Sequence, residues 1–236
     1  MSPITSLKKI VVFTGAGISA ESGIKTFRDS GGLWEEYNIN DIATPAAWER
    51  NPQLVLAFYN KRRQQVMDAK PNAAHKALVK LEKKFDVHII TQNIDDLHKR
   101  AGSKKILPLH GEIMKSRSSI NPAIIYDIKK GEIKMGDKCE IGSQLRPHIV
   151  WFGELVPNME KAYFITQTAD ILIIIGTSLS VYPAAGLIDY APVNAPKYLV
   201  DPKEMDMKTI PNLFFIKENA TKGVPLLVAE LLNDIK

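Results

Sequence analysis

Short apolar runs alternate with amphipathic segments along the 236 residues of the chain. Each run is bounded by Gly, Pro, Asn or Asp, a pattern that predicts buried parallel strands. The expected strands are Lys9–Thr14, Val87–Thr91, Asp170–Gly176, Lys197–Asp201 and Asn212–Ile216. Three other segments place apolar residues at helical spacing, and we expect helices at Pro52–Asp68, Ala73–Lys84 and Val224–Ile235.

This alternation of strands and helices predicts the fold class: α/β, with a doubly wound, mostly parallel Rossmann-like sheet. Two stretches, from residue 23 to about 52 and from 113 to about 147, break the alternation. We interpret them as a smaller inserted module. Residues 1–236 then form a single domain, with the core at about 1–22, 60–111 and 148–236 and the module at about 23–59 and 112–147.

The composition narrows the function classes. Hydrophobic residues make up 45% of the chain, and 31 Lys and Arg against 26 Asp and Glu leave a net charge of +5 that is spread along the sequence. Anionic ligands are therefore favoured, but no specific nucleic-acid partner is expected. The single Cys139 excludes an intrachain disulfide and a metal site of several thiolates.

No apolar run approaches the ~20 residues that a membrane span needs. The run Ile171–Ile175, for example, has five residues, and the N-terminal residues do not have the pattern of a signal peptide. We therefore expect a soluble, cytoplasmic protein with no membrane partner, and the sequence leaves its oligomeric state open.

A glycine-rich turn, Gly15 to Ala20, directly follows the first expected strand and has the pattern G-x-G-x-x-A. Glycine lets the backbone approach a pyrophosphate closely, and amides at the start of the next helix can hold phosphate oxygens. The alternative is an ordinary tight turn. No acidic residue ends a second strand roughly 20 positions on, because Glu35 and Glu36 lie in a loop region. A hydride-transfer enzyme is therefore the weaker interpretation.

Five motifs in fixed order resemble the sirtuin family of NAD-dependent protein-lysine deacylases over nearly the whole chain. They are GAGISAESGIKTFRDSGGLW from Gly15, TQNIDDLHKRAG from Thr91, LHG from Leu109, LRPHIVWFGE from Leu145 and GTSLSVYPAA from Gly176. The resemblance implies NAD as cofactor and acyl-lysine proteins or peptides as substrates. In the implied reaction, the acyl-lysine amide oxygen attacks the nicotinamide ribose. The products are free lysine, nicotinamide and O-acyl-ADP-ribose.

The same resemblance assigns the cofactor-binding residues. They are Gly15, Ala16, Gly17, Ile18, Phe27, Arg28, Gln92, Asn93, Ile94, Asp95, His110, Gly176, Thr177, Ser178 and Ala220. Gln92, Asn93 and Asp95 follow a strand, where doubly wound folds bind ligands. The alternative is a helix cap, and Asn93 or Asp95 could serve both purposes. The chain departs from the family at Lys25, where a proline is usual. It departs again at Leu199-Val200-Asp201, where an asparagine is frequent.

His110 and Asn93 are the catalytic candidates. The other four histidines fall within strand or helix patterns, whereas His110 precedes a glycine and aligns with the family's general base. An imidazole titrates near neutral pH, which suits removal of a proton from a sugar hydroxyl.

Tyr59 and Arg62 stand three positions apart on an expected helix and therefore share a face. They resemble the Tyr-x-x-Arg pair of class III sirtuins, and Ala43 matches a small residue near that acyl pocket. The resemblance implies removal of succinyl or malonyl groups, with acetyl also accepted. The alternative is a solvated arginine and a core tyrosine. The segment Val150, Trp151, Phe152, Gly153 and Glu154 resembles the family's peptide-docking strand, although its hydrophobic residues could also be plain core.

Most sirtuins hold zinc with two Cys-x-x-Cys pairs, and here the pattern fails. The corresponding positions are Ser118, Asn121, Cys139 and a residue near Ile141, which are not four zinc donors. We therefore expect no zinc and no other metal. We expect packing to hold the module together instead, through Ile120, Ile124, Ile125, Tyr126, Ile133 and Met135.

Two alternative functions remain. One is an NAD-cleaving ADP-ribosyltransferase or hydrolase. The other is a non-catalytic NAD-binding module. The presence of Asn93, Asp95 and His110 argues against simple binding, because binding alone needs no base.

Overall fold

The computed structural model describes residues 7–26, 37–128, 131–179, 181–203 and 210–234. A six-stranded sheet runs through its centre in the order β3-β2-β1-β7-β8-β9, with every neighbouring pair parallel. Its strands are β1 (Lys9–Thr14), β2 (Asp86–Thr91), β3 (Ile106–Pro108), β7 (Ile171–Ile175), β8 (Lys197–Val200) and β9 (Leu213–Ile216). The strand order reverses between β1 and β7. The expected Rossmann-like α/β fold is confirmed.

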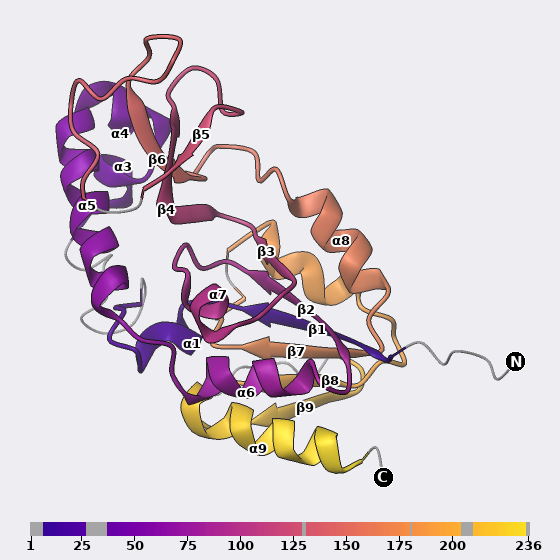
Figure 1. Cartoon of the computed structure of the whole chain (residues 1–236). Helices are drawn as coiled ribbons and strands as arrows, with labels where there is room; N and C mark the ends of the chain where they lie inside the picture. The colour runs from indigo at the N-terminus through magenta and orange to yellow at the C-terminus, as the bar shows by residue number, and fades with distance from the viewer. Residues whose placement is uncertain (1–6, 27–36, 129–130, 180, 204–209, 235–236) are drawn as a thin grey trace, which may run out of the picture.

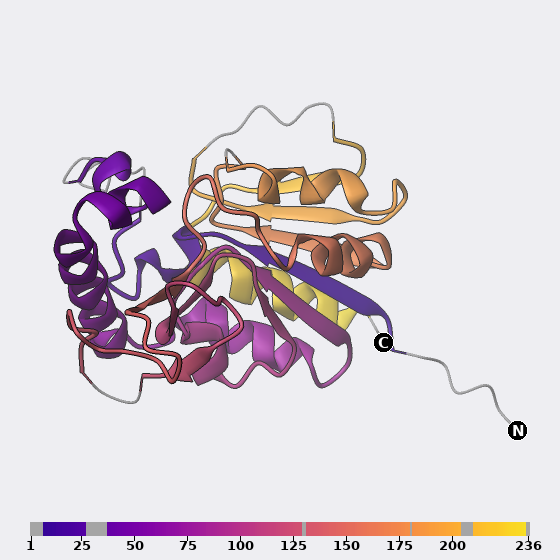
Figure 2. The ribbon, with the colours of Figure 1, turned by 90° about the horizontal axis from the view of Figure 1, so that it is seen from above.

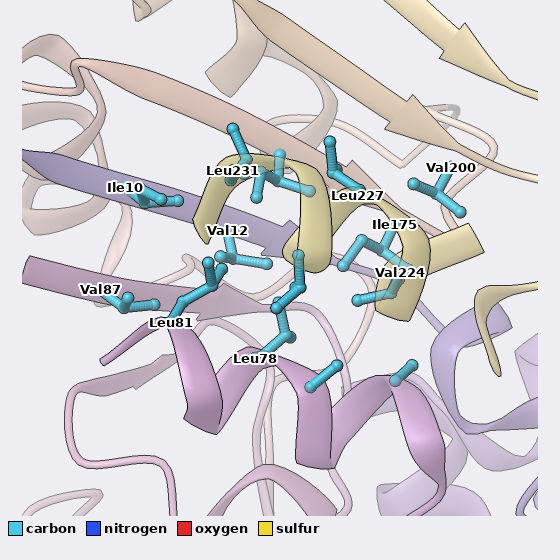
Figure 3. Packing of buried hydrophobic residues seen from close by; sticks show 14 of the residues in the cluster. Ile10, Val12, Leu78, Leu81, Val87, Ile175, Val200, Val224, Leu227 and Leu231 are labelled. Atoms are coloured by element: carbon cyan, nitrogen blue, oxygen red, sulfur yellow. The ribbon is translucent and has the colours of Figure 1, made fainter. Parts of the chain in front are cut away.

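Alternate side chains of the central strands supply two cores. Ile10 and Val12 point to one face and pack under α6 (Ala73–Leu81) and α9 (Ala220–Asn233), as Figure 3 shows. Val11 and Phe13 point to the opposite face, which α8 (Met159–Gln167) and the 3-10 helix η1 (Ala184–Tyr190) cover. Both faces of the sheet are therefore buried, which explains why its strands are apolar without interruption.

The smaller module has its own antiparallel sheet of three strands in the order β5-β4-β6. These are β4 (Gly111–Ser118), β5 (Ile125–Asp127) and β6 (Leu145–Ile149). Beside them lie α3 (Ile39–Ile42), α4 (Pro45–Arg50) and the long α5 (Pro52–Asp68), at the upper left of Figure 1 and again at one side of the sheet in Figure 2. A third hydrophobic cluster, which includes Ile42, Phe58, Ile113 and Trp151, joins these helices to β4 and the end of β6.

Local capping explains where two of the helices begin. The Asn51 side chain accepts the Leu54 amide at the start of α5, and Asn72 accepts the amides of Ala74 and His75 at the start of α6. The other helices among the described residues are short: α1 (Gly17–Ala20) and α7 (Leu97–Ala101). None of the helices in the described part of the chain has the length and apolar character that a membrane span requires.

The expectation about packing in the module is wrong. Ile120, Ile125 and Met135 are 76%, 42% and 47% exposed, and of the six apolar side chains expected to pack, Ile133 is the fully buried one. The module is joined to α5 by the third hydrophobic cluster and by polar contacts instead: Asn60 binds both main-chain groups of Ile133, and Arg63 donates to the Ile113 carbonyl.

Candidate functional site

A cavity of about 760 Å³ opens at the carboxyl ends of β1, β2 and β7, between the main sheet and the module. In an open α/β sheet this is where a ligand is expected, because the strand order reverses there. Most of the predicted site residues line it: Gly15, Ala16, Gly17, Tyr59, Arg62, Gln92, Asn93, Ile94, His110, Val150, Trp151, Phe152, Gly153, Gly176, Thr177, Ser178 and Ala220. Of the others, Ile18 and Asp95 lie off the wall, and Phe27 and Arg28 fall outside the described residues.

The main chain of the glycine-rich turn packs directly against the main chain at the end of β7. The Gly15 amide donates to the Ile175 carbonyl at 3.0 Å, and the Gly17 amide donates to the Gly176 carbonyl at 2.8 Å. A Cβ on Gly17 would lie 2.6 Å from the Gly176 Cα, so no larger residue fits there. These glycines therefore form the cavity floor by letting two backbones touch.

Ile18 differs from the other residues of the expected phosphate-binding set, because it does not line the cavity. Its side chain is completely buried in the core beneath β1, and its amide donates to the Gly15 carbonyl at 3.3 Å. The residue fixes the start of α1 and does not present a group to the cavity.

Asn93 stands on the wall and is anchored by its own amide group. Its Nδ2 donates to the Gly15 carbonyl at 3.0 Å and to the Ser19 hydroxyl at 3.3 Å. Asp95 lies off the wall, where it accepts the Ser19 hydroxyl at 2.9 Å and the Leu97 amide at 3.0 Å. Burial raises the pKa of the Asp95 carboxyl. The Asp95 side chain thus accepts an amide at the start of α7, and its part in cofactor binding stays a prediction.

His110 follows β3 and is held in one tautomer. Its Nδ1 lies 3.0 Å from the Gln92 carbonyl oxygen, which can only accept, so Nδ1 carries the proton in the neutral ring. Burial lowers the pKa of His110, although the bond to Gln92 opposes that shift. At neutral pH the ring is therefore uncharged, and Nε2 can accept a proton.

Tyr59 and Arg62 project from α5 into the same cavity, and both are almost fully buried. The alternative of a solvated arginine is therefore wrong. Arg62 Nη2 donates to the Lys25 carbonyl at 2.7 Å, and Nη1 donates to Gln65 Oε1 at 3.3 Å. Burial lowers the pKa of Arg62 to about 10 and raises that of Tyr59, so near neutral pH one is a cation and the other an uncharged phenol.

The expected docking strand is a turn. β6 ends at Ile149, and residues 150–153 bend back over the cavity with Gly153 at φ +90°. The Val150 amide donates to the His110 carbonyl and the Phe152 amide to the Ala43 carbonyl, each at 3.0 Å. Because these donors are already used, strand addition through them is not available in this conformation.

One carboxylate holds that turn in place. Glu154 accepts the Trp151 amide at 2.8 Å, Arg146 Nη1 at 2.8 Å and Arg117 Nη2 at 3.1 Å. The Arg146 guanidinium also lies 3.2 Å from the centre of the Trp151 ring. The sequence placed Glu154 only at the end of the expected docking strand and did not predict its role as the anchor of the turn.

The sequence identified Leu199-Val200-Asp201 only as a departure from the family and assigned no site residues to the far end of the cavity. It is lined by Val181, Tyr182 and Pro183 beside η1, by Val200, Asp201, Pro202 and Lys203 after β8, and by Asn219 before α9. The position of residues 200–203 at the carboxyl end of a strand could have identified them.

The residues where most sirtuins hold zinc form a hydrogen-bonded cluster. The Ser118 and Ser143 hydroxyl oxygens lie 2.7 Å apart, and Cys139 Sγ lies 3.0 Å from Ser143 Oγ. Ile141 is 56% exposed, so Ser143 is the residue that faces Cys139. One thiol and two hydroxyls do not match the four soft or imidazole donors that structural zinc requires.

No group of three or more His, Cys, Asp and Glu side chains converges anywhere in the described ranges. The absence of zinc nevertheless remains a prediction.

Comparison with known proteins identifies the family. The Sir2 family model matches residues 15–183, and the chain belongs to that family. A Bacteroides thetaiotaomicron protein named NAD-dependent protein deacylase is 53% identical over 223 residues, which covers 92% of this chain and 95% of the relative.

Solved structures agree with that assignment. A Sir2 homologue in complex with NAD has 35% identity and a TM-score of 0.86, over 98% of this chain and 91% of that one. A Sir2 variant bound to a deacetylated p53 peptide and 3′-O-acetyl ADP ribose has 29% identity and a TM-score of 0.80, over 97% of this chain and 94% of that one.

Proposed function

We propose that this protein is an NAD-dependent protein-lysine deacylase that prefers succinyl or malonyl groups and also accepts acetyl. The observation that supports it is one cavity lined by the glycine-rich turn, by Asn93 and His110, and by Tyr59 and Arg62. The relatives and solved complexes described above support the NAD-dependent deacylase part, and the acyl preference rests on the last two side chains.

The cavity suits a dinucleotide in shape and chemistry. The floor made by Gly15, Gly17 and Gly176 gives a large ligand close access to main chain, and polar side chains of Thr177 and Ser178 lie at the end of β7. Gln92 Nε2 donates to the Thr177 hydroxyl at 3.1 Å, so the two walls of the cavity are connected. In this assignment Ala220 lies on the adenosine side. Bound NAD would supply the electrophilic ribose carbon and the nicotinamide leaving group.

His110 is assigned the general base. Its Nδ1–H is committed to the Gln92 carbonyl, so the lone pair is on Nε2, and its lowered pKa keeps that lone pair available at neutral pH. Asn93 is held rigidly by Gly15 and Ser19, as a group that orients substrate has to be. The Trp151 side chain of the turn at 150–153 is buried and lines the cavity, where it would help to exclude water from the reacting centre.

Tyr59 and Arg62 are assigned the role of binding the carboxylate of an acidic acyl group. A buried guanidinium that stays charged near pH 7 stabilises an anion more strongly than an exposed one, because the surroundings screen it less. The neutral Tyr59 phenol can donate a further hydrogen bond. Ala43, which is small and also lines the cavity, leaves room for the acyl chain.

The test compares acetyl-, succinyl- and malonyl-lysine forms of one peptide with NAD, with product peptide and nicotinamide both quantified. We expect succinyl or malonyl turnover to exceed acetyl turnover. The Arg62→Met and Tyr59→Phe variants should lose about 10- to 100-fold of kcat/KM on the acidic acyl groups, as expected for a charged hydrogen bond of about 1.5–3 kcal/mol, and little on acetyl.

Lys61→Met is the matched control, because Lys61 is a cation one position away on the exposed face of α5. If acetyl turnover exceeds succinyl turnover and Arg62→Met changes neither, the acyl preference is wrong. If NAD is consumed with no change to the peptide, the deacylase assignment is wrong.

A further inference from the structure

The loop between β2 and α7 carries Gln92, Asn93 and Ile94 of the cavity wall, and buried hydroxyls hold it from behind. Thr14 and Thr91 are register partners at the carboxyl ends of β1 and β2. The Thr14 hydroxyl donates to Thr91 Oγ1 at 2.8 Å, and the same oxygen accepts the Asn93 amide at 3.0 Å. Thr91 therefore fixes the point at which the chain leaves the strand and enters the cavity wall.

His98 on α7 adds a third side chain to the hydrogen bond between Thr14 and Thr91. Its Nε2 lies 3.1 Å from Thr14 Oγ1, and because the Thr14 proton goes to Thr91, Nε2 has to donate. Burial, and to a smaller extent the neighbouring His75, lower the pKa of His98 to about 3. The ring is therefore neutral with its proton on Nε2. The hydrogen bonds run in one direction, from His98 through Thr14 to Thr91.

A histidine at this position is otherwise unfavourable. His98 is 3% exposed, and its Nδ1 has no hydrogen-bond partner among the described residues. A buried polar atom without a partner costs stability that an apolar side chain of similar size would avoid. The bond to Thr14 is therefore what distinguishes histidine from an apolar residue here.

The loop also controls His110. The Gln92 amide donates to the Thr14 carbonyl at 2.9 Å, and the Gln92 carbonyl accepts His110 Nδ1–H at 3.0 Å. Thr14 thus holds the loop at two points, through its carbonyl and through its hydroxyl. A shift of this loop would move Asn93 and release the His110 tautomer together.

We infer that His98 is a positioning residue for the reaction: through Thr14 and Thr91 it fixes Asn93 and the Gln92 carbonyl, and through that carbonyl the tautomer of His110. The kinetic part of this inference rests on the proposed function, whereas the effect on the tautomer does not.

The kinetic experiment removes one hydroxyl at constant volume. Thr91→Val should lower kcat by about 10- to 100-fold, and KM for the acyl peptide should stay within about twofold of wild type. The reason is that a displaced catalytic group slows the chemical step far more than it weakens substrate binding. Thr91→Ser keeps the hydroxyl and should restore kcat. His98→Leu should resemble Thr91→Val, whereas His98→Gln, which keeps an N–H donor, should retain more activity.

Thr166→Val is the matched control. Thr166 is a buried threonine of α8 that donates to the Ala162 carbonyl at 2.8 Å and does not line the cavity. The Thr166→Val variant should lower Tm about as much as Thr91→Val does and should leave kcat unchanged. If kcat follows Tm in both variants, the effect is on folding alone and the inference is wrong.

The second readout needs no catalysis. Nitrogen-15 NMR of histidine-labelled protein reports the tautomer of each ring, and the His110→Asn spectrum assigns His110. We expect the His110 ring to be protonated on Nδ1 in wild type. In Thr91→Val and His98→Leu we expect a mixture of the Nδ1–H and Nε2–H tautomers of His110. An unchanged His110 tautomer in both variants would overturn the inference. If wild type does not deacylate at all, the proposed function fails, and this measurement still decides the positioning role.

Discussion

Asn60 and Ile133 bind each other through two hydrogen bonds across the junction between α5 and the module. The Asn60 Nδ2 donates to the Ile133 carbonyl at 2.9 Å, and the Ile133 amide donates to Asn60 Oδ1 at 3.1 Å. Arg63, on the same helix, donates to Asn60 Oδ1 as well. A single side chain therefore satisfies both main-chain groups of a buried residue in a segment with little regular structure.

Replacing that side chain should loosen the module. Asn60→Leu would leave the Ile133 amide and carbonyl without partners, and we expect a loss of about 1–3 kcal/mol in the free energy of unfolding, or about 2–4 °C of Tm per kcal/mol. The measurement is thermal or urea unfolding followed by circular dichroism. Gln64→Leu is the control, because Gln64 makes a single exposed bond to Asp68 on the same helix. Equal losses in both variants would contradict a role for the Asn60 contact.

The second prediction concerns the zinc content of the purified protein. The Ser118–Ser143–Cys139 cluster supplies one thiol and two hydroxyls instead of four good donors, so purified protein should contain far less than one zinc per chain. A chelator should leave its Tm unchanged. The triple variant Ser118→Cys, Asn121→Cys and Ser143→Cys should bind zinc and become sensitive to the chelator. Elemental analysis that finds one tightly bound zinc in wild type would refute the prediction.

The main sheet was predictable because its strands are buried on both faces. Ile10 to Phe13 and Ile171 to Ile175 contribute to two cores, so their apolar runs are continuous and easily recognised. The module was not predictable in the same way. Its polar contacts run through Asn60 and Arg63, whose partners Ile133 and Ile113 lie 73 and 50 residues away along the sequence.

Most of the candidate site was also predictable, because the motifs fall where strands end. Two details needed the fold. Whether Ile18 faces the core or the cavity depends on the direction of a single helical turn, and the sequence pattern of the turn does not determine it. Similarly, nothing local shows that the amides of Val150 and Phe152 are consumed by His110 and Ala43, which lie in distant segments.

The pH dependence of activity should report His110. Burial, its main influence, lowers the pKa of His110, so the acid limb of kcat/KM should have its midpoint below the usual value of about 6.5. Activity is full above that pKa and is lost as the pH falls through it, because the base then becomes protonated. Initial rates from about pH 5 to about pH 9 measure the limb.

Removing the base should remove that limb. His110→Asn should lose about 10²- to 10⁴-fold in kcat, while His88→Asn, on β2 and off the cavity wall, should keep the wild-type profile. Full activity of His110→Asn, or an acid limb with its midpoint above neutrality, would contradict the assignment of His110 as base.

Glu154 should make the site sensitive to acid. Burial raises the pKa of its carboxyl, but the hydrogen bonds and positive charge of Arg146, the Trp151 amide and Arg117 outweigh that effect, and the net shift is downward. A carboxylate whose folded pKa is lowered stabilises the protein fully above its unfolded value, and that contribution is lost as the pH falls through the folded pKa. The Tm difference between wild type and Glu154→Gln should therefore be largest near neutral pH and disappear under acidic conditions.

The same substitution should raise KM for the acyl peptide more than it lowers kcat, because Glu154 holds the turn at 150–153 and not the base. Unfolding curves from about pH 3 to about pH 7, together with steady-state kinetics near neutral pH, measure both effects. Glu160→Gln, an exposed carboxylate in the first turn of α8, should change neither. A Tm difference that stays constant with pH would show that the charge of Glu154 is not what holds the turn.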